Sequence, residues 1–439
     1  MTPCLSASVP RLMSWAGHSH VVRSGKVSVT IEGAVAIARR LELNYFGFGS
    51  PWDEEDRRVC AEIEASSESV QRYFEGAWQG RDLLRAHRFA EWRRRFSDAS
   101  LLFGVDNESP KGRYGHLWWI GWHPDFPFFH DYDQPNEWWM HHGRQGPPPP
   151  YARREMADIL DLQRAHGALA VMAHPTSWWW DAKGGFVTNL ASELPLLLAT
   201  GHAPDAMVVM GYDADHAGYQ GFWHHLIGKG FYLPGVAELD WSLDDPSSLA
   251  HIPLVNLVRL DEGEAWTETL LKEKVRRGAV VMTSGPRLWA QLAGKDPGSE
   301  VPAAEADAMM LSFSEGGVPV RRVELLHNGA VVRTVEHGGS FGGFTLPLGD
   351  ARDGWWIVKA FGADPVRQVA ISNPFFVGAR KRPAPRPPFL MPHPYPSAWR
   401  DLTDYLALGH FHRDFKGLRP GELPPEAFRL DDFLQAIGR

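Results

Sequence analysis

The sequence predicts an α/β fold followed by a small antiparallel β region, and three observations indicate this. From about residue 26 to 282, amphipathic helical patterns alternate with short apolar runs that are typical of buried strands. After residue 286 the runs become short and alternate between polar and apolar residues, as antiparallel strands do. From residue 379 the chain is rich in proline. We therefore expect three regions, at residues 1–285, 286–378 and 379–439.

The first helix and the next three strands are expected between residues 32 and 122. The helix lies in EGAVAIARRLEL, and its apolar face is formed by Ala34, Ile37, Ala38 and Leu41. The apolar run NYFGFG follows as a strand. Residues 53–97 are charged and contain no proline, which predicts one or two helices. Strands are then expected in ASLLFGV (99–105) and GHLWWIGW (115–122).

The same alternation continues to residue 282. YARREMADILDLQRAH is amphipathic and precedes the strand GALAVMA, and AMVVMG, GFWHHLIGKG and FYLPGVAE repeat the order strand, helix, strand. This order predicts a parallel sheet covered by helices, either open or closed into a barrel. Residues 123–150 end in GPPPP and interrupt the alternation, so we expect a long loop over a site.

The second region is expected to contain hairpins. In RRVELLHNGAVVRTVEH, Asn328–Gly329 is a hairpin turn sequence, and DGWWIVKAFG and QVAISNPFFV continue the strand pattern. The tail begins extended, becomes weakly helical, and is expected to lie over the main region.

The composition excludes several classes of protein. The chain has 44% hydrophobic and 22% charged residues, as globular proteins do, and its net charge of −8 argues against a nucleic-acid partner. Its two cysteines exclude a disulfide framework and a cysteine zinc site. The first residues do not form a secretory signal, and no run reaches the ~18 apolar residues of a membrane span. We expect a cytoplasmic protein without membrane or nucleic-acid partners, and the sequence allows a homo-oligomer.

His18 and His20 are the first candidate metal ligands. Alternate side chains of a strand share a face, so these two imidazoles would project together; the alternative is a pair of half-exposed histidines on an edge strand. Further candidates follow predicted strands, where α/β barrels present catalytic groups. They are Asp106, Glu108, His116, His174 and Asp240. Each alone could be a polar cap or a hydrogen-bonded buried group, but together they form a ligand set that suits zinc, manganese or iron.

The order of these motifs resembles a known family. HSH, GVDNES with GH, AHP and GFYLPGVAELD are similar to motifs of the PHP (polymerase and histidinol phosphatase) superfamily of metal-dependent hydrolases. RRGAVVMTSGP, VELLHNGAVV and ISNPFFV resemble its carbaryl-hydrolase-like branch. The resemblance covers about residues 13–378 and implies a distorted (β/α)7 TIM-like barrel holding up to three metals. It also implies that His18, His20 and Asp240 bind one metal, and that His116 and His174 bind a second.

The resemblance further implies a carboxylate between the two metals, for which Asp106 and Glu108 both remain candidates. Three family histidines are replaced, by Lys26, by Ser50 with Pro51, and by Ser242. All three belong to the third-metal group in the family. We therefore expect two divalent metal ions and a working enzyme.

A water between two divalent ions is the expected nucleophile, because its pKa is lowered towards neutrality. Aromatic rings near the predicted ligands suit a flat apolar substrate; they are Trp118, Trp119, Trp122, Trp138, Trp139 and Trp178. The sequence thus predicts hydrolysis of an ester, amide or carbamate of an aromatic or bulky small molecule. One alternative is phosphoester hydrolysis, with Lys111 and Arg113 binding phosphate. Another is a non-catalytic metal- or carbohydrate-binding module.

The loop at residues 123–150 is expected to close over the metal site and to set substrate choice. Its two ends follow and precede segments that carry predicted ligands, and it combines aromatic rings with histidines. The alternative is an interface, in which the same residues pack against the tail or another subunit.

Overall fold

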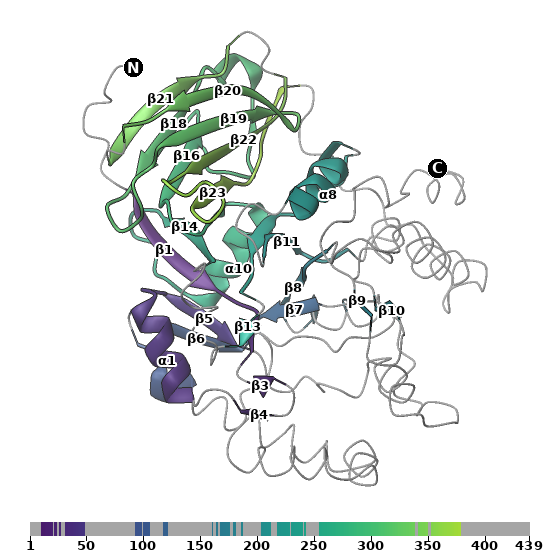
Figure 1. Ribbon diagram of the computed structural model, residues 1–439, viewed down its shortest axis with the longest axis vertical. Helices are drawn as coiled ribbons and strands as arrows, with labels where there is room; N and C mark the ends of the chain where they lie inside the picture. Colours follow the sequence, from purple (N-terminus) through teal and green to yellow (C-terminus); the bar gives the residue numbers. More distant parts are fainter. Residues whose placement is uncertain are drawn as a thin grey trace, which may run out of the picture.

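In the computed structural model the described residues form a mixed α/β fold that consists mostly of strands (Figure 1). The residues that the structure describes are 10–20, 22–23, 26–27, 31–48, 93–98, 100–105, 117–121, 160, 164–165, 167–175, 179–180, 186–187, 203–211, 217–228, 230–239, 241–242, 254–338, 341–349 and 353–378. Of the predicted helical stretch 53–97 the structure describes only residues 93–97, of which 93–96 are helical, and the loop at 123–150 and the tail at 379–439 lie outside the described residues.

The largest sheet has eleven strands and runs through both main regions of the sequence. Its path, from one edge to the other, is β17 (Glu300–Val301), β24 (Phe375–Val377), β22 (Gly354–Phe361), β23 (Val369–Ser372), β15 (Val281–Thr283), β14 (Val255–Leu260), β1 (Arg11–Ala16), β5 (Tyr45–Phe48) and β6 (Leu102–Val105), with β19 (Arg322–His327) on β22 and β20 (Ala330–Glu336) on β19.

A second sheet has four strands, in the order β12 (Gly235–Ala237), β11 (Ala206–Met210), β8 (Leu169–Met172) and β7 (Leu117–Ile120). A third contains β16 (Leu288–Leu292), β18 (Ala308–Phe313) and β21 (Gly342–Pro347). Short pairs join β2 (Ser19–His20) to β13 (Trp241–Ser242), β3 (Val22–Arg23) to β4 (Lys26–Val27), and β9 (Trp179–Trp180) to β10 (Phe186–Val187). The helices are α1 (Ile31–Arg40), α8 (Ala217–Gly228), α10 (Glu268–Arg277) and the 3-10 turn η4 (Ala303–Glu305).

The alternation of helices and parallel strands is confirmed in part. β1, β5 and β6 run parallel, as do β8, β11 and β12. Helix α1 forms where the apolar stripe predicted it, and α8 forms in GFWHHLIGKG and the residues before it.

The expected distorted (β/α)7 barrel is not evident in the described residues, in which these strands form two separate sheets. β7 pairs antiparallel with β8, and β1 pairs antiparallel with β14. A parallel barrel needs a continuous parallel ladder, and these two antiparallel pairs interrupt it. The apolar pattern along a strand does not encode the direction of its neighbour, so the sequence could not reveal this.

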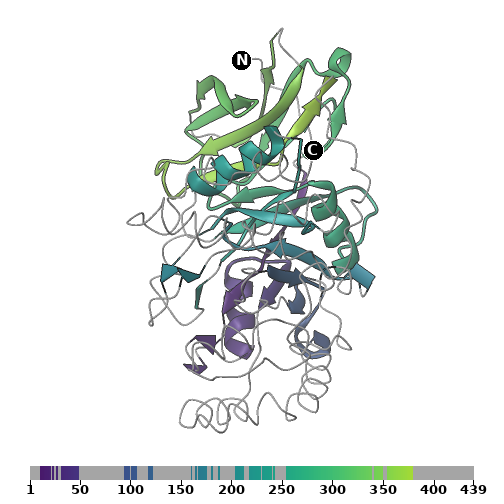
Figure 2. The ribbon, with the colours of Figure 1, turned by 90° about the vertical axis from the view of Figure 1, so that its right-hand side faces the viewer.

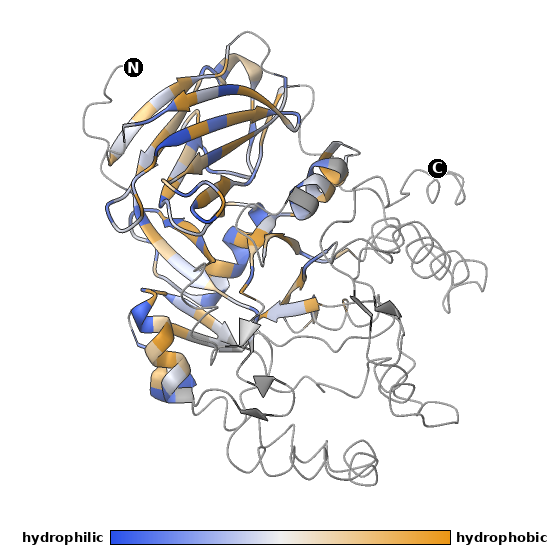
Figure 3. Cartoon of the chain, viewed as in Figure 1, coloured by the Kyte–Doolittle hydropathy of each residue, from blue (hydrophilic) through white to orange (hydrophobic). Residues whose placement is uncertain are grey.

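The antiparallel character of the second region is confirmed. β19 and β20 form the predicted hairpin, and Asn328 and Gly329 at its turn have φ of 51° and 85°. Positive φ at both central residues is what a type I′ turn requires. Figure 3 shows hydrophobic and hydrophilic residues alternating along these strands.

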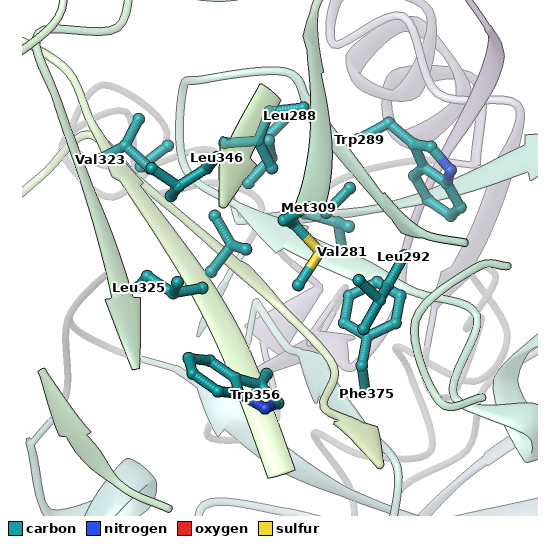
Figure 4. Packing of buried hydrophobic residues seen from close by; sticks show 14 of the residues in the cluster. Val281, Leu288, Trp289, Leu292, Met309, Val323, Leu325, Leu346, Trp356 and Phe375 are labelled. Carbon is teal, nitrogen blue, oxygen red and sulfur yellow. The ribbon is translucent and has the colours of Figure 1, made fainter. Parts of the chain in front are cut away.

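Two groups of buried side chains stabilise the fold. Between the sheets of the antiparallel region, Leu288, Met309, Leu325, Trp356 and Phe375 belong to one core (Figure 4). A second core, under the parallel strands, contains Trp15, Tyr45, Trp118, Val171 and Val236. Figure 2 shows that the antiparallel strands occupy one end of the described part, and α1 with β5 the other. None of the described helices has the length and apolar character needed to cross a membrane.

Candidate metal centre

His18 lies in the turn between β1 and β2, and its side chain is buried. Its φ is 57°, in the left-handed region that residues other than glycine seldom adopt. A backbone in this conformation costs about 1–3 kcal/mol, so the surrounding contacts must hold it. The turn directs the imidazole towards the ends of β8 and β12.

His174 follows β8, after Ala173, and is also buried. Pro175 comes directly after it and cannot donate to a sheet, so no strand pairing resumes at this point. The ring centroids of His174 and His18 are 5.7 Å apart. Two residues that are 156 positions apart in the sequence therefore present imidazoles to the same interior site.

Glu238 follows β12 and is completely buried. Its Oε2 lies 2.6 Å from Nδ1 of His18, and the backbone N–H of His174 donates to its Oε1 at 2.9 Å. A buried carboxylate is costly unless it is hydrogen-bonded, and both oxygens of Glu238 have partners here. The carboxylate therefore links the two histidines.

Parallel strands explain why the three residues meet. The carboxyl ends of β8, β11 and β12 lie at one edge of the four-stranded sheet, and Glu238 N–H donates to Met210 O at 2.9 Å. Leu239 N–H then donates to Gly17 O at 3.2 Å. β13 pairs with β2, so that Ser242 lies opposite His20. The chain segments after β1 and β12 thus run side by side.

The donor set fits a divalent metal ion. One ligand atom from each of His18, His174 and Glu238 lies within 4.8 Å of the others. Two imidazoles suit borderline cations such as zinc, and a carboxylate beside them can orient one of the rings. Two ligands of a tetrahedral zinc ion are about 3.3 Å apart, so the 2.6 Å contact between His18 Nδ1 and Glu238 is a hydrogen bond and not shared coordination. This contact resembles the carboxylate–histidine pairs that orient metal-binding imidazoles.

The structure brings together only part of the predicted ligand set. His18 and His174 meet. For His20 only the backbone is described, on β2. Other predicted ligands and substrate-binding residues lie outside the described residues; these are Asp106, Glu108, His116, Asp240, Trp122, Trp138, Trp139, Trp178, Lys111 and Arg113.

Trp118 and Trp119 lie on β7, and neither ring has exposed surface. Side chains alternate along a strand, so the two rings face opposite sides of the sheet. The Trp118 ring lies 6.0 Å from the His18 ring and 6.4 Å from the Trp15 ring, measured between centroids. Trp118 therefore packs beside the candidate centre, and a role for either tryptophan in binding a substrate remains a prediction.

The reasoning that placed His18 and His20 on one face of a strand is corrected. The strand ends at Ala16 and a new one begins at Ser19, with the left-handed His18 between them. A turn of this kind breaks the alternation, because it holds only for consecutive extended residues.

Glu238 was missed by sequence reasoning. The available signal was an acidic residue directly after the apolar run LPGVA, two positions before Asp240. The resemblance pointed to Asp240, which lies outside the described residues; the structure adds Glu238 through its contact with His18.

No family model and no curated protein matches this sequence. Among solved structures, the chain is similar to endonuclease Q in complex with a 27-mer duplex substrate with an abasic lesion, at 15% identity and a TM-score of 0.34. That match covers 61% of this chain and 57% of the endonuclease Q chain. The chain is also similar to PsfC from Pseudomonas syringae PB-5123, at 13% identity and a TM-score of 0.32, covering 58% and 86% of the two chains. TM-scores this low do not establish a common fold and carry no argument about function.

Proposed function

We propose that this protein is a divalent-metal-dependent hydrolase whose metal centre is built on His18, His174 and Glu238. The observation that carries the proposal is the burial of these three groups in mutual contact, at the ends of three strands far apart in the sequence. Buried titratable groups of this kind are rare without a partner such as a metal ion. The motif resemblance to PHP hydrolases supports the same reaction class.

Each residue has a distinct role in this proposal. His18 would bind the ion through Nε2, because its Nδ1 is directed at Glu238. His174 supplies the second imidazole, and its backbone N–H holds the Glu238 carboxylate in place. The ion, when bound, would supply a Lewis acid and lower the pKa of a water. The buried side chains exclude bulk solvent, which strengthens electrostatic interactions inside the site.

We extend the proposal to a second metal ion and to a substrate class. As the motif resemblance implies, His20 and Asp240 would join His18 on one ion and His116 would join His174 on the other, with Asp106 or Glu108 between the ions. The substrate would be an aromatic or bulky small-molecule ester, amide or carbamate, and the tryptophan-rich segments would bind its apolar part.

Metal binding and turnover test the proposal together. Protein purified without added metal is analysed for bound zinc, manganese and iron, and is assayed on aryl esters, aryl carbamates and aryl phosphates. His174→Ala should weaken metal binding at least 10-fold and abolish turnover. His327→Ala is the matched control, because His327 stacks on Trp356 in the antiparallel region, and it should keep both. Full metal content and activity in His174→Ala would exclude the proposal, and turnover of phosphates alone would exclude the ester, amide and carbamate class.

A further inference from the structure

The strand β12, which leads to Glu238, pairs with β11 in an irregular register. Its partner β11 pairs with it at Gly235 and Val236, but the register shifts between Val208 and Met210, so the ladder is irregular at Ala237. β12 is also the last strand of its sheet in the described part of the chain. The residue just before Glu238 is therefore the one that the β11 ladder holds least regularly.

The other edge of β12 is held by two asparagine side chains in place of a strand. Asn256 accepts a hydrogen bond from Ala237 N–H at 2.7 Å and donates to Ala237 O at 2.9 Å. Asn373 makes the equivalent pair with Gly235, at 2.7 and 2.8 Å. A side-chain amide has one donor and one acceptor side by side, as a strand residue does, so each asparagine replaces one rung of a ladder.

Asn256 is itself rigidly placed. It is completely buried on β14, in the interior of the eleven-stranded sheet, and pairs with Trp15 of β1 on one side and Met282 of β15 on the other. β1 leads to His18, three residues after Trp15. Asn256 thus joins the strand that carries His18 to the strand that carries Glu238.

We propose that Asn256 is a positioning residue for the metal centre. Its amide fixes the Ala237 peptide at the point where the β11 ladder is irregular, and so sets the position of the Glu238 carboxylate against Nδ1 of His18. The oriented carboxylate then determines how His18 meets the ion. This inference rests on the proposed metal centre.

Asn373, which lies between β23 and β24, is a matched control because it bonds to the same strand, β12. It bonds to Gly235 where the pairing with β11 is regular, and also to Val280 O at 3.0 Å and Tyr232 Oη at 3.0 Å. Asn373→Ala therefore removes more hydrogen bonds than Asn256→Ala, but at a point three residues from Glu238.

The test uses the full chain with Co²⁺ as the probe. The affinity for Co²⁺ is measured by competition with a chelator, its coordination by the visible absorption spectrum, and the stability of each variant by urea unfolding. Both alanine variants should lower stability, Asn373→Ala at least as much as Asn256→Ala. Only Asn256→Ala should weaken Co²⁺ binding about 10-fold or more and change the spectrum. If Asn256→Ala does not fold, Asn256→Asp, which keeps the acceptor for Ala237 N–H, replaces it.

The possible outcomes separate the two proposals. If the unaltered protein binds no Co²⁺, the metal centre itself is refuted. If it binds Co²⁺ and the folded Asn256 variant has the same affinity and spectrum, the positioning role alone is wrong. Equal weakening in the Asn256 and Asn373 variants would also overturn it, since the effect would then follow from general loss of β12 packing.

Discussion

His18 has three features that rarely coincide in one residue. Its backbone is left-handed, its side chain is buried, and its Nδ1 lies 2.6 Å from a buried carboxylate. A conformation with this cost persists only where the surroundings determine it. The contact with Glu238 and the packing of the surrounding strand ends hold the His18 backbone in this conformation. A strained residue held in this way points to a functional role.

Removal of the Glu238 charge tests its role at this scale. Glu238→Gln keeps the size of the side chain but replaces one carboxylate oxygen by an amide donor, so the side chain can no longer accept hydrogen bonds from both His18 and the His174 backbone N–H. We expect metal affinity to fall 10- to 100-fold. Chelator competition measures this. Glu324→Gln, on β19, is the control and should bind metal normally; unchanged affinity in Glu238→Gln would contradict the role of the carboxylate.

Asp98, which lies outside the candidate centre, is expected to contribute to the dependence of folding stability on pH. Hydrogen bonds from the Ser100 hydroxyl and backbone, then from Leu101 N–H, with the charge of Arg39, lower the pKa of Asp98 from 3.8 to about 2. Since the folded pKa is below the unfolded one, Asp98 stabilises the fold above pH 3.8. This stabilisation is lost as the pH falls to about 2.

Asp98→Asn should therefore reduce the loss of stability between pH 5 and pH 2.5, as measured by urea unfolding. The side chain is 43% exposed, so solvent screening makes the effect modest. A variant with the same pH dependence as the unaltered protein would contradict the assignment.

At the scale of elements, the β19–β20 hairpin depends on its turn residues. Gly329 has a φ of 85°, and a Cβ there would lie 3.3 Å from the Trp355 ring. Gly329→Ala should cost about 1–2 kcal/mol of unfolding free energy, since other residues avoid the left-handed region. Gly338→Ala, where a Cβ meets nothing within 4 Å, is the control in thermal unfolding. Equal stability of the two variants would show that the turn is not under this constraint.

At the scale of the whole molecule, the two main predicted regions share one sheet. β15 pairs with β23 across the predicted boundary at residue 285, and Asn373 bonds to Gly235 and Val280. A chain of residues 1–285 would lose β23, one of the two strands that pair with β15, and one of the two asparagines that hold β12. We expect it to unfold without cooperativity in urea, followed by circular dichroism, whereas residues 1–378 unfold cooperatively. Cooperative unfolding of residues 1–285 would show instead that the first region is an independent domain.

Local features of the chain were predictable because they depend on residues close together in sequence. The apolar runs predicted β5, β6, β8 and β11, because burial of a strand requires a continuous apolar segment. Asn328–Gly329 predicted its hairpin because the two residues tolerate positive φ. His174 was noticed because it follows a predicted buried strand, and His18 because it stands two positions from His20.

Only the tertiary structure decided strand direction, the open sheet and the third member of the candidate centre. Whether a neighbour runs parallel or antiparallel is set by the path of the chain between strands, which the side-chain pattern does not record, so β7 and β14 could not be oriented from sequence. Glu238 joins His18 and His174 through its contacts with the His18 imidazole and the His174 backbone, and these form between segments far apart in the sequence. The sequence by itself therefore determined which segments are buried and which polar residues end them. The packing of strands distant in sequence decided which of those residues meet, because contacts between them form only when the sheets are assembled.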